Sequence, residues 1–399
     1  MSHSIFLTRV AIRNYKSIAQ CDVQLHALTW LIGPNGSGKS NFLDALHFVR
    51  DALDNSLENA LRERGGISEV RRKSYGHPNN FGIRLEFVLP NGTPGRYAFT
   101  VGALPNNGYE VKKEECRIGL NANCDYFLVE RGEVVDTSAA VFPKTTADRL
   151  ALLNASGLPE FRPLYDAMIS MGFYNLNPKI IREPQKPQDG RSLKSAGENI
   201  ASVIAHLTKG APEAIDEISE YLSKVIPSLH GVERKAIGPL ETLMFKQEVS
   251  GSKSPWEFYA QNMSDGTLRA VGILTALNQV SDHSRPTLIG LEEPETALHP
   301  AAASTLREAL VKASQRMQVI VTSHSPDLLD DPEIRSDSLV SVVASGGETK
   351  LAPVDEASRD VLSKKLFTPG ELLRLNQIGP DKKSQGFLNS KQINLFQED

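Results

Sequence analysis

The sequence predicts an α/β protein with a mixed sheet, an antiparallel β subdomain and an inserted lid of helices and strands. Three observations predict this fold. A short apolar run, residues 28–32, leads into a glycine-rich loop and an amphipathic helix. A second apolar run, residues 288–291, ends in acidic residues. Between these runs, residues 83–89 alternate apolar and polar side chains, as a half-buried strand does.

Length and composition are those of an ordinary globular protein. The 399 residues are 40% hydrophobic and 23% charged, enough for a large core and two subdomains. With 44 basic and 48 acidic residues the net charge is -4, which neither requires nor excludes nucleic acid. Three cysteines without metal spacing, no signal-peptide pattern and no long apolar run predict a cytoplasmic protein without a membrane segment.

The glycine-rich loop is a complete G-x-x-x-x-G-K-S motif, and it lies between a predicted strand and a predicted helix. Backbone N–H groups of such a loop surround a phosphate, and the helix N-terminus adds its dipole. Lys39 is expected to reach the β- and γ-phosphates of ATP, and Ser40 to ligate Mg²⁺. The residues predicted to bind the nucleotide here are Gly33, Pro34, Asn35, Gly36, Ser37, Gly38, Lys39, Ser40 and Asn41. A chance glycine turn explains this order of elements poorly.

Three acids, Glu292, Glu293 and Glu295, crowd the end of the second apolar run. Like charges repel and their desolvation is costly, so the segment is either a polar turn or the neighbour of a bound cation. With Mg²⁺ at the loop, we predict that Glu292 binds the metal directly or through water. Glu293 is predicted to polarise the attacking water. Glu295 is expected to be a turn or interface residue.

Two further segments accompany the acids. Residues 318–322 form a third apolar strand, after which His324 stands where open α/β sheets place ligands. Ser325 and Pro326 are expected to begin a helix. Upstream, Ser264, Asp265, Gly266 and Thr267 precede an apolar helix; alone, this S-D-G-T segment is also an ordinary helix cap.

In this order, the loop, the S-D-G-T segment, the paired glutamates and the histidine resemble ABC-type ATPase heads. The branch that they resemble most is that of RecF, the structural-maintenance-of-chromosomes (SMC) proteins and the OLD-family ATPases. Residues 12–18, IRNYKSI, resemble the opening strand of that branch, and Lys16 in it is predicted to contact the cofactor. The resemblance covers residues 1–60 and 255–345 and implies a P-loop NTPase with an ABC-type mixed sheet.

The resemblance also implies roles. The glycine-rich loop is the Walker A loop, Glu292 the Walker B acid, Glu293 the catalytic glutamate and His324 the switch histidine. Lys39, Glu293 and His324 are then the catalytic residues. The S-D-G-T segment is the signature motif, and residues 297–300 take the position of the D-loop. In such proteins ATP lies between two heads, so the resemblance implies a homodimer on ATP binding. Two departures are the glutamate in place of the usual Walker B aspartate, and S-D-G-T in place of S-G-G-Q.

The predicted organisation is a core of residues 1–60 and 255–355, an insertion of residues 61–254 and a C-terminal helical segment with a flexible tail, residues 356–399. No heptad pattern supports a coiled coil, so the insertion is expected to be a compact lid or arm. Its basic residues 71–73 fit either a phosphate contact or a solvated turn.

Near its end the polar tail has a pentapeptide with an apolar pair, and this pentapeptide resembles the short sequence by which bacterial proteins dock on the sliding clamp. Its residues are Gln392, Ile393, Asn394, Leu395 and Phe396. The alternative is a tail that packs on its own domain.

The resemblance implies an ATP-driven dimerising switch in nucleic-acid maintenance or anti-phage defence, working with nucleic acid or with a separate TOPRIM-type nuclease effector. An OLD-type nuclease would need a fused TOPRIM domain, for which the sequence after residue 343 leaves no room. The ATPase subunit of a transporter is opposed by the signature sequence and the large insertion. A non-hydrolysing scaffold is opposed by Glu293.

Overall fold

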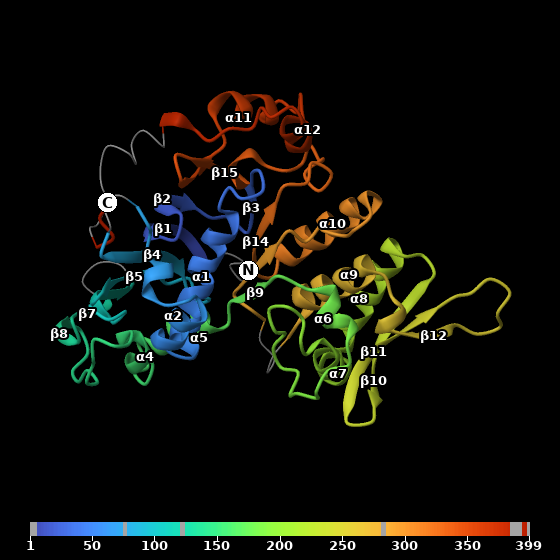
Figure 1. The fold of residues 1–399 in the computed structure, drawn as a ribbon, viewed down its shortest axis with the longest axis horizontal. Helices are drawn as coiled ribbons and strands as arrows, with labels where there is room; N and C mark the ends of the chain where they lie inside the picture. Colours follow the sequence, from blue (N-terminus) through green and yellow to red (C-terminus); the bar gives the residue numbers. More distant parts are fainter. Residues whose placement is uncertain (1–5, 75–77, 120–123, 281–284, 384–392, 397–399) are drawn as a thin grey trace.

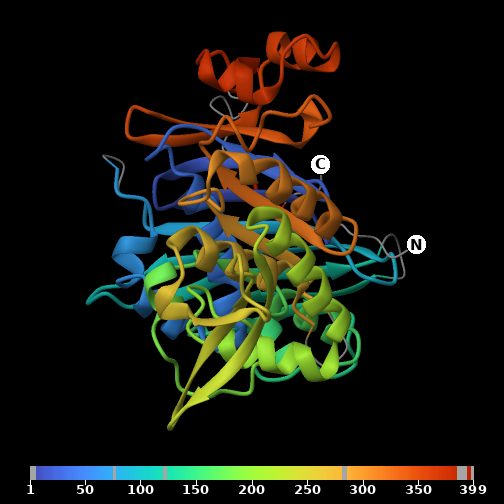
Figure 2. The ribbon, with the colours of Figure 1, turned by 90° about the vertical axis from the view of Figure 1, so that its right-hand side faces the viewer.

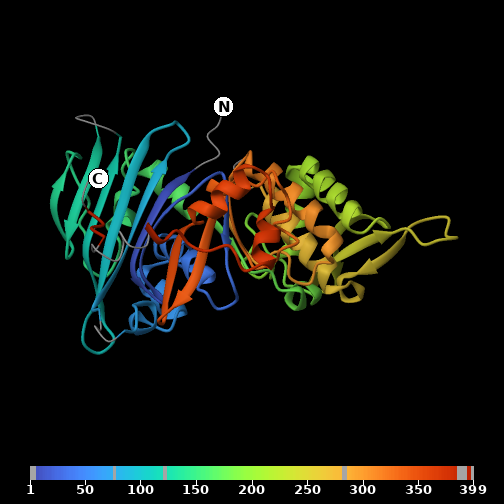
Figure 3. The same ribbon diagram turned by 90° about the horizontal axis from the view of Figure 1, so that it is seen from above.

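A mixed sheet of thirteen strands runs through the molecule in the order β8-β7-β6-β5-β4-β1-β2-β16-β15-β3-β14-β13-β9. The structure is a computed structural model that describes residues 6–74, 78–119, 124–280, 285–383 and 393–396. A second sheet of three antiparallel strands, β10-β11-β12, projects at the far right of Figures 1 and 3. The predicted α/β fold with a mixed sheet, an antiparallel part and inserted helices is confirmed.

The elements have the following bounds. The strands are β1 (Leu7–Tyr15), β2 (Ile18–Gln24), β3 (Leu28–Ile32), β4 (Asn80–Val88), β5 (Pro94–Ala103), β6 (Tyr109–Ile118), β7 (Asp125–Glu130), β8 (Glu133–Thr137), β9 (Gly172–Tyr174), β10 (Leu229–Ile237), β11 (Leu240–Gln247), β12 (Trp256–Tyr259), β13 (Leu288–Glu292), β14 (Gln318–Ser323), β15 (Leu339–Ser345) and β16 (Glu348–Pro353). The α-helices are α1 (Lys39–Asp54), α2 (Leu57–Glu63), α3 (Ile67–Val70), α4 (Ala151–Ala155), α5 (Arg162–Ile169), α6 (Pro178–Arg182), α7 (Ile200–Gly210), α8 (Pro212–Val225), α9 (Asp265–Asn278), α10 (Ala303–Ser314), α11 (Glu356–Ser363) and α12 (Pro369–Arg374).

The parallel half of the sheet, β15-β3-β14-β13-β9, is covered on both faces. Successive side chains of a strand point to opposite faces, so each central strand contributes to two cores. In β3, Leu31 joins the core beneath α1, whereas Trp30 and Ile32 join the core beneath α9 and α10. The continuous apolar runs in the sequence therefore belong to strands that are buried on both sides.

The antiparallel half continues the same sheet. β4 pairs with β1, and β5 to β8 follow it as a meander. Its turns place Gly92 (φ 85°) and Asn107 (φ 59°) in the left-handed region, which the Asn-Gly pairs in the sequence predict. In the described part of the chain the longest helix, α1, has 16 residues, so the inserted segment is compact rather than a rod. The residue boundaries of the domains stay a prediction.

The C-terminal helices lie against the loop that follows β14. α11 and α12 form a separate layer at the top of Figure 2. Arg374 of α12 pairs with Asp327 and Asp330 at 2.6 and 3.1 Å. The helix predicted at Ser325 and Pro326 was wrong, because residues 326–329 form a turn. The Leu329 carbonyl accepts a hydrogen bond from the backbone N–H of Gly370 in α12. It therefore bonds to a distant segment instead of to the next turn of a helix.

The tail residues Ile393 to Phe396 pack on their own domain. Leu395 is 1% exposed and lies directly over Gly82 of β4. The Ile393 N–H donates to Gln20 Oε1 at 3.2 Å, and Lys113 Nζ lies 5.1 Å from the centre of the Phe396 ring. Gln392 lies outside the described residues. A sliding clamp would therefore have to compete with this packing for Leu395 and Phe396.

No helix in the described ranges is long and apolar enough to cross a membrane.

The buried side-chain amide of Gln318 links the start of β1 to the central strand β14. Gln318, at the start of β14, is fully buried. Its Oε1 accepts from the N–H groups of Phe6 and Leu7 at 3.2 and 2.8 Å. Its Nε2 donates to the carbonyls of Leu7 and His26 at 2.7 and 3.1 Å. This side chain therefore satisfies four backbone groups, three of which belong to the buried residues Phe6 and Leu7.

We predict that Gln318→Leu lowers the free energy of unfolding by about 3 kcal/mol, because buried backbone groups lose their partners. Denaturant titration measures the change. Gln315→Leu is the matched control: Gln315 is exposed at the end of α10, and its replacement should change stability by less than about 0.5 kcal/mol. Equal stabilities of the two variants would contradict this role.

Candidate functional site

The glycine-rich loop joins β3 to α1 and is shaped by two glycines in the left-handed region. Gly36 has φ 76° and Gly38 has φ 99°, values that L-residues with a Cβ rarely adopt. A Cβ on Gly38 would lie 1.9 Å from Thr349 Oγ1 of β16, whereas one on Gly36 would meet nothing within 4 Å. The loop is therefore packed against the sheet on one side and open on the other.

Side chains around the loop brace it. Thr349 Oγ1 donates to the Ser37 carbonyl at 2.9 Å and lies 2.6 Å from Ser17 Oγ. Asn41 Nδ2 donates to the same Ser17 oxygen at 2.6 Å. Lys16 forms an ion pair with Asp44 of α1. Asn41 and Lys16 thus bind protein groups in this structure, and their contact with a nucleotide stays a prediction.

Lys39 is folded back onto its own loop. Its Nζ donates to the carbonyls of Gly33 and Pro34 at 2.9 and 3.1 Å and lies 3.8 Å from Glu293 Oε1. Burial lowers the pKa of Lys39, and the nearby glutamates oppose this effect. Ser37 Oγ is buried without a hydrogen-bond partner in the described part of the chain. A donor-rich loop with an unmatched hydroxyl fits a phosphate group.

The first acid meets the loop directly. Glu292 ends β13, and its Oε2 accepts a hydrogen bond from Ser40 Oγ at 2.8 Å. Burial raises the pKa of Glu292, and the charges of Asp44 and Glu293 add to this effect. A hydroxyl and a carboxylate are the hard oxygen ligands that Mg²⁺ prefers. The described residues contain no group of three or more His, Cys, Asp or Glu that could hold a metal ion.

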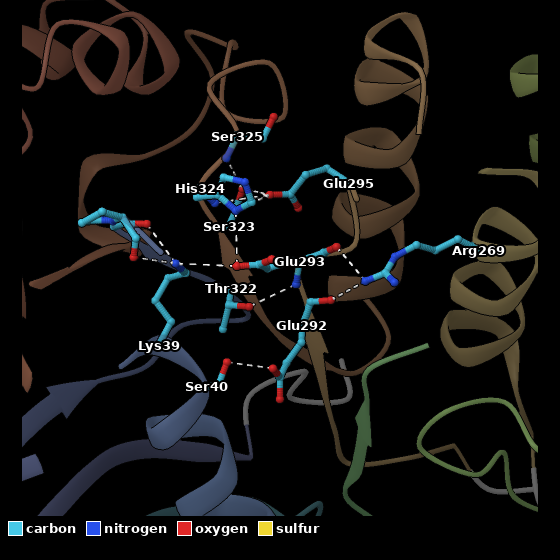
Figure 4. A network of polar contacts seen from close by, with 12 residues as sticks. Lys39, Ser40, Arg269, Glu292, Glu293, Glu295, Thr322, Ser323, His324 and Ser325 are labelled. Atoms are coloured by element: carbon cyan, nitrogen blue, oxygen red, sulfur yellow. Dashed lines mark hydrogen bonds and ion pairs between the residues drawn. The ribbon is translucent and has the colours of Figure 1, made fainter. Parts of the chain in front are cut away.

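The second acid is held by its backbone in an unusual conformation. Glu293 has φ 41°, in the left-handed region, which costs a non-glycine residue on the order of 1 kcal/mol. Its N–H donates to Thr322 O and Thr322 Oγ1 at 3.0 and 3.1 Å. Its carbonyl accepts from Arg269 Nη2 at 2.9 Å (Figure 4). Contacts on both sides of the residue therefore hold the strained backbone in place.

The carboxylate of Glu293 lies between two cationic or polar groups. His324 Nδ1 is 3.3 Å from Glu293 Oε1, the same oxygen that Lys39 approaches from another direction (Figure 4). Glu295 Oε1 accepts from Ser323 Oγ at 2.7 Å and from the His324 N–H at 3.3 Å. Glu295 is thus the residue that fastens the histidine loop, a more specific contact than the turn or interface role expected from sequence.

The S-D-G-T segment makes its contacts elsewhere. Ser264 Oγ caps α9 by accepting from the Thr267 N–H at 3.2 Å. Asp265 pairs with Arg182 of α6. A Cβ on Gly266 would lie 2.6 Å from the carbonyl oxygen of Ala297. The structure therefore brings the loop, the paired glutamates and His324 into mutual contact, while Ser264, Asp265 and Gly266 contact α6 and residue 297.

The basic residues 71–73 contact protein groups. Arg71 donates to the Pro78 carbonyl, Arg72 pairs with Glu348 and Lys73 pairs with Glu69. Arg71 and Arg72 are half-buried and Lys73 is exposed, as in a solvated turn, and in the described ranges these contacts are with groups outside the glycine-rich loop.

Sequence reasoning missed Arg269 and Thr322. Neither belongs to a motif, and both act through backbone groups. Arg269 carried one signal: it is a charged residue in an otherwise apolar helix, α9, and such a residue is seldom buried without partners.

Two family profiles match the chain. The family described as "AAA ATPase domain" matches residues 6–117, and the family described as "AAA domain, putative AbiEii toxin, Type IV TA system" matches residues 195–330. The first contains the glycine-rich loop, and the second contains the S-D-G-T segment, the paired glutamates and His324.

Similar proteins include a nuclease, a chromosome-maintenance protein and a DNA replication and repair protein. The Old nuclease of Escherichia phage P2 is 25% identical over an alignment of 372 positions, which covers 82% of this chain and 57% of the nuclease. The structural maintenance of chromosomes protein 1 of Schizosaccharomyces pombe is 26% identical over 40% of this chain and 14% of its own length. The DNA replication and repair protein RecF of Vibrio parahaemolyticus is 46% identical over 44 residues, 11% of this chain and 12% of RecF. The chain thus spans less than two thirds of each.

Among solved structures, the SmcHead bound to the C-winged helix domain of ScpA has the same fold. It superposes with a TM-score of 0.56 and 15% identity over 87% of this chain and 97% of that one.

We predict that Mg²⁺-dependent nucleotide binding weakens as the pH falls below neutrality, because metal ligands must be deprotonated. The raised pKa of Glu292 means that protons compete with the cation at a higher pH than they would at an ordinary glutamate. Titrating a fluorescent ATP analogue with Mg²⁺ at each pH measures this. Glu292→Gln has no carboxylate to protonate at this position, so the pH dependence that remains in the variant comes from the nucleotide's own phosphates. The same pH dependence in wild type and variant would contradict the assignment of Glu292 as a metal ligand.

Proposed function

The chain is an ABC-type ATPase head of the RecF-, SMC- and OLD-like branch, and on this premise we propose that it hydrolyses Mg²⁺-ATP bound between two copies of itself. The observation that carries the proposal is the convergence of five side chains. Lys39 and Ser40 leave the loop after β3, Glu292 and Glu293 leave the end of β13, and His324 leaves the end of β14. A phosphate-binding loop, a metal-binding pair and a water-activating carboxylate are the parts that phosphoryl transfer to water requires.

Each residue has a distinct role in this proposal. Ser40 and Glu292 would hold Mg²⁺, which supplies charge neutralisation on the phosphates. Lys39 exchanges the carbonyls of its own loop for phosphate oxygens. Glu293 accepts a hydrogen bond from the attacking water and orients it, and its strained backbone fixes the direction of the carboxylate. His324 lies 3.3 Å from that carboxylate and is placed to orient it or to contact the terminal phosphate.

The S-D-G-T residues supply the second half of the site, from a partner copy. Ser264 and Asp265 are exposed at the N-terminus of α9, a helix of 14 residues whose dipole favours an anion at this end. Their contacts lie away from their own glycine loop. A second copy could bring these residues to the phosphates of the first, so ATP would join two heads into a homodimer.

The similar proteins suggest what the ATP switch serves. One is a nuclease and another is a DNA replication and repair protein by name. We propose a role in nucleic-acid maintenance or anti-phage defence, in which the ATP-bound dimer is recognised by a separate nuclease effector of the TOPRIM type. A nuclease on the same polypeptide is the second candidate, favoured by the alignment of 82% of this chain with the Old nuclease. Cleavage of DNA by this chain alone distinguishes the two.

We predict that Glu293→Gln slows phosphate release by about 10²- to 10⁴-fold while ATP still binds, because only the orientation of water is lost. The variant should therefore accumulate as an ATP-dependent dimer. Light scattering with Mg²⁺, with and without ATP, measures the mass, and phosphate release measures turnover.

Glu308→Gln is the matched control, since Glu308 is exposed on α10; it should behave as wild type. The proposed function would be overturned if the mass were the same with and without ATP and if Glu293→Gln released phosphate at the wild-type rate.

A further inference from the structure

Arg269 joins the helix of the S-D-G-T segment to the backbone of the two paired acids. The side chain is 7% exposed and leaves the second turn of α9. Its Nη2 donates to the carbonyls of Glu292 and Glu293 at 3.0 and 2.9 Å, and its Nη1 donates to the Leu176 carbonyl at 2.6 Å. One planar guanidinium thus satisfies three backbone acceptors from two segments, through two separate nitrogens whose spacing the single nitrogen of a lysine does not reproduce.

α9 touches the same acidic segment at a second place. Gly266, in the first turn, lies so close to Ala297 that a Cβ would be 2.6 Å from the Ala297 carbonyl oxygen. Ala297 itself has φ 66°, in the left-handed region. The helix therefore grips residues 292–297 at both ends, by Arg269 at one and by close backbone packing at the other. A shift of α9 must move this segment with it.

Because the backbone of Glu293 is strained, its contact with Arg269 affects the direction of the Glu293 carboxylate. A left-handed non-glycine residue persists only where its surroundings hold it. Thr322 holds the N–H of Glu293, and Arg269 holds its carbonyl. Release of the carbonyl lets the peptide rotate, and this rotation redirects the side chain that lies between Lys39 and His324.

We propose that Arg269 is a positioning residue that makes the orientation of Glu293 depend on the position of α9. Contact of Ser264 and Asp265 with the nucleotide of a partner copy then sets the carboxylate that acts on this chain's own nucleotide. Hydrolysis at one site is thereby coupled to occupancy of the other. The inference rests on the proposed function, which it deepens, and it assigns the coupling to one side chain outside the recognised motifs.

The test is Arg269→Lys, which keeps the charge and loses the fork. We expect kcat for ATP to fall by about 10- to 100-fold, because small misplacements of a catalytic group cost this much. ATP affinity and the ATP-dependent dimer mass should stay within about threefold of wild type. A residue that merely supported the fold would lower affinity, dimer formation and kcat together.

The double variant Arg269→Lys with Glu293→Gln separates the two explanations further. If Arg269 acts through the Glu293 carboxylate, the double variant should turn over as slowly as Glu293→Gln alone. An additional loss of tenfold or more in the double variant would overturn the proposal.

Arg316→Lys is the control, because Arg316 contacts the other end of α9 through Asn278 Oδ1 at 3.1 Å. It should leave kcat unchanged. If Arg269→Lys does not fold, Arg269→Gln is measured in its place; wild-type kcat in a folded variant overturns the coupling. Should Glu293→Gln also hydrolyse ATP normally, the proposed function fails, which is a different result from a normal Arg269→Lys beside an inactive Glu293→Gln.

Discussion

Parallel pairing of β3, β14 and β13 is the constraint on which the site depends. In the register of these strands, Ile32 is opposite Ser323, and Thr322 is opposite Glu292. The residues that follow these positions are the glycine-rich loop, His324 and Glu293, so all three leave the sheet at the same level. A slip of one residue in either pairing would turn the alternating side chains to the opposite face and separate the catalytic groups. The double-sided core beneath α1, α9 and α10 therefore fixes the register and, through it, the chemistry.

Three glutamates can share this edge because each has a different partner. Glu292 accepts from Ser40, Glu293 lies between Lys39 and His324, and Glu295 accepts from Ser323. Glu292 and Glu293 contact Ser40 and Lys39 at the end of the glycine-rich loop, whereas Glu295 contacts the end of β14. Repulsion between the acids is thus spread over separate contacts, and a divalent cation between Ser40 and Glu292 would relieve it further.

The sequence was sufficient to predict the groups that follow strand ends. A loop, an acid pair and a histidine that each follow an apolar run must meet if those runs are parallel neighbours. Contacts through backbone groups could not be predicted this way. Arg269 and Thr322 bind carbonyl and N–H groups whose positions exist only after packing. The turn at residues 326–329 is fixed by α12 from a distant part of the chain, and propensity at Pro326 predicted a helix instead.

The central claim is that the site is composed from two copies, and mixing two inactive variants tests it most directly. Lys39→Ala damages the loop half, and Ser264→Arg damages the signature half. In a mixed dimer both defects fall in one site and the other site is intact. Phosphate release at equal concentrations should therefore rise above that of either variant alone, to at most about a quarter of wild type, because the coupling proposed above slows a site whose partner site is empty. Lys39→Ala mixed with Glu293→Gln is the control, because each site then keeps one defect and the mixture should stay inactive. No recovery in the first mixture, or equal recovery in both, would contradict a site shared between two copies.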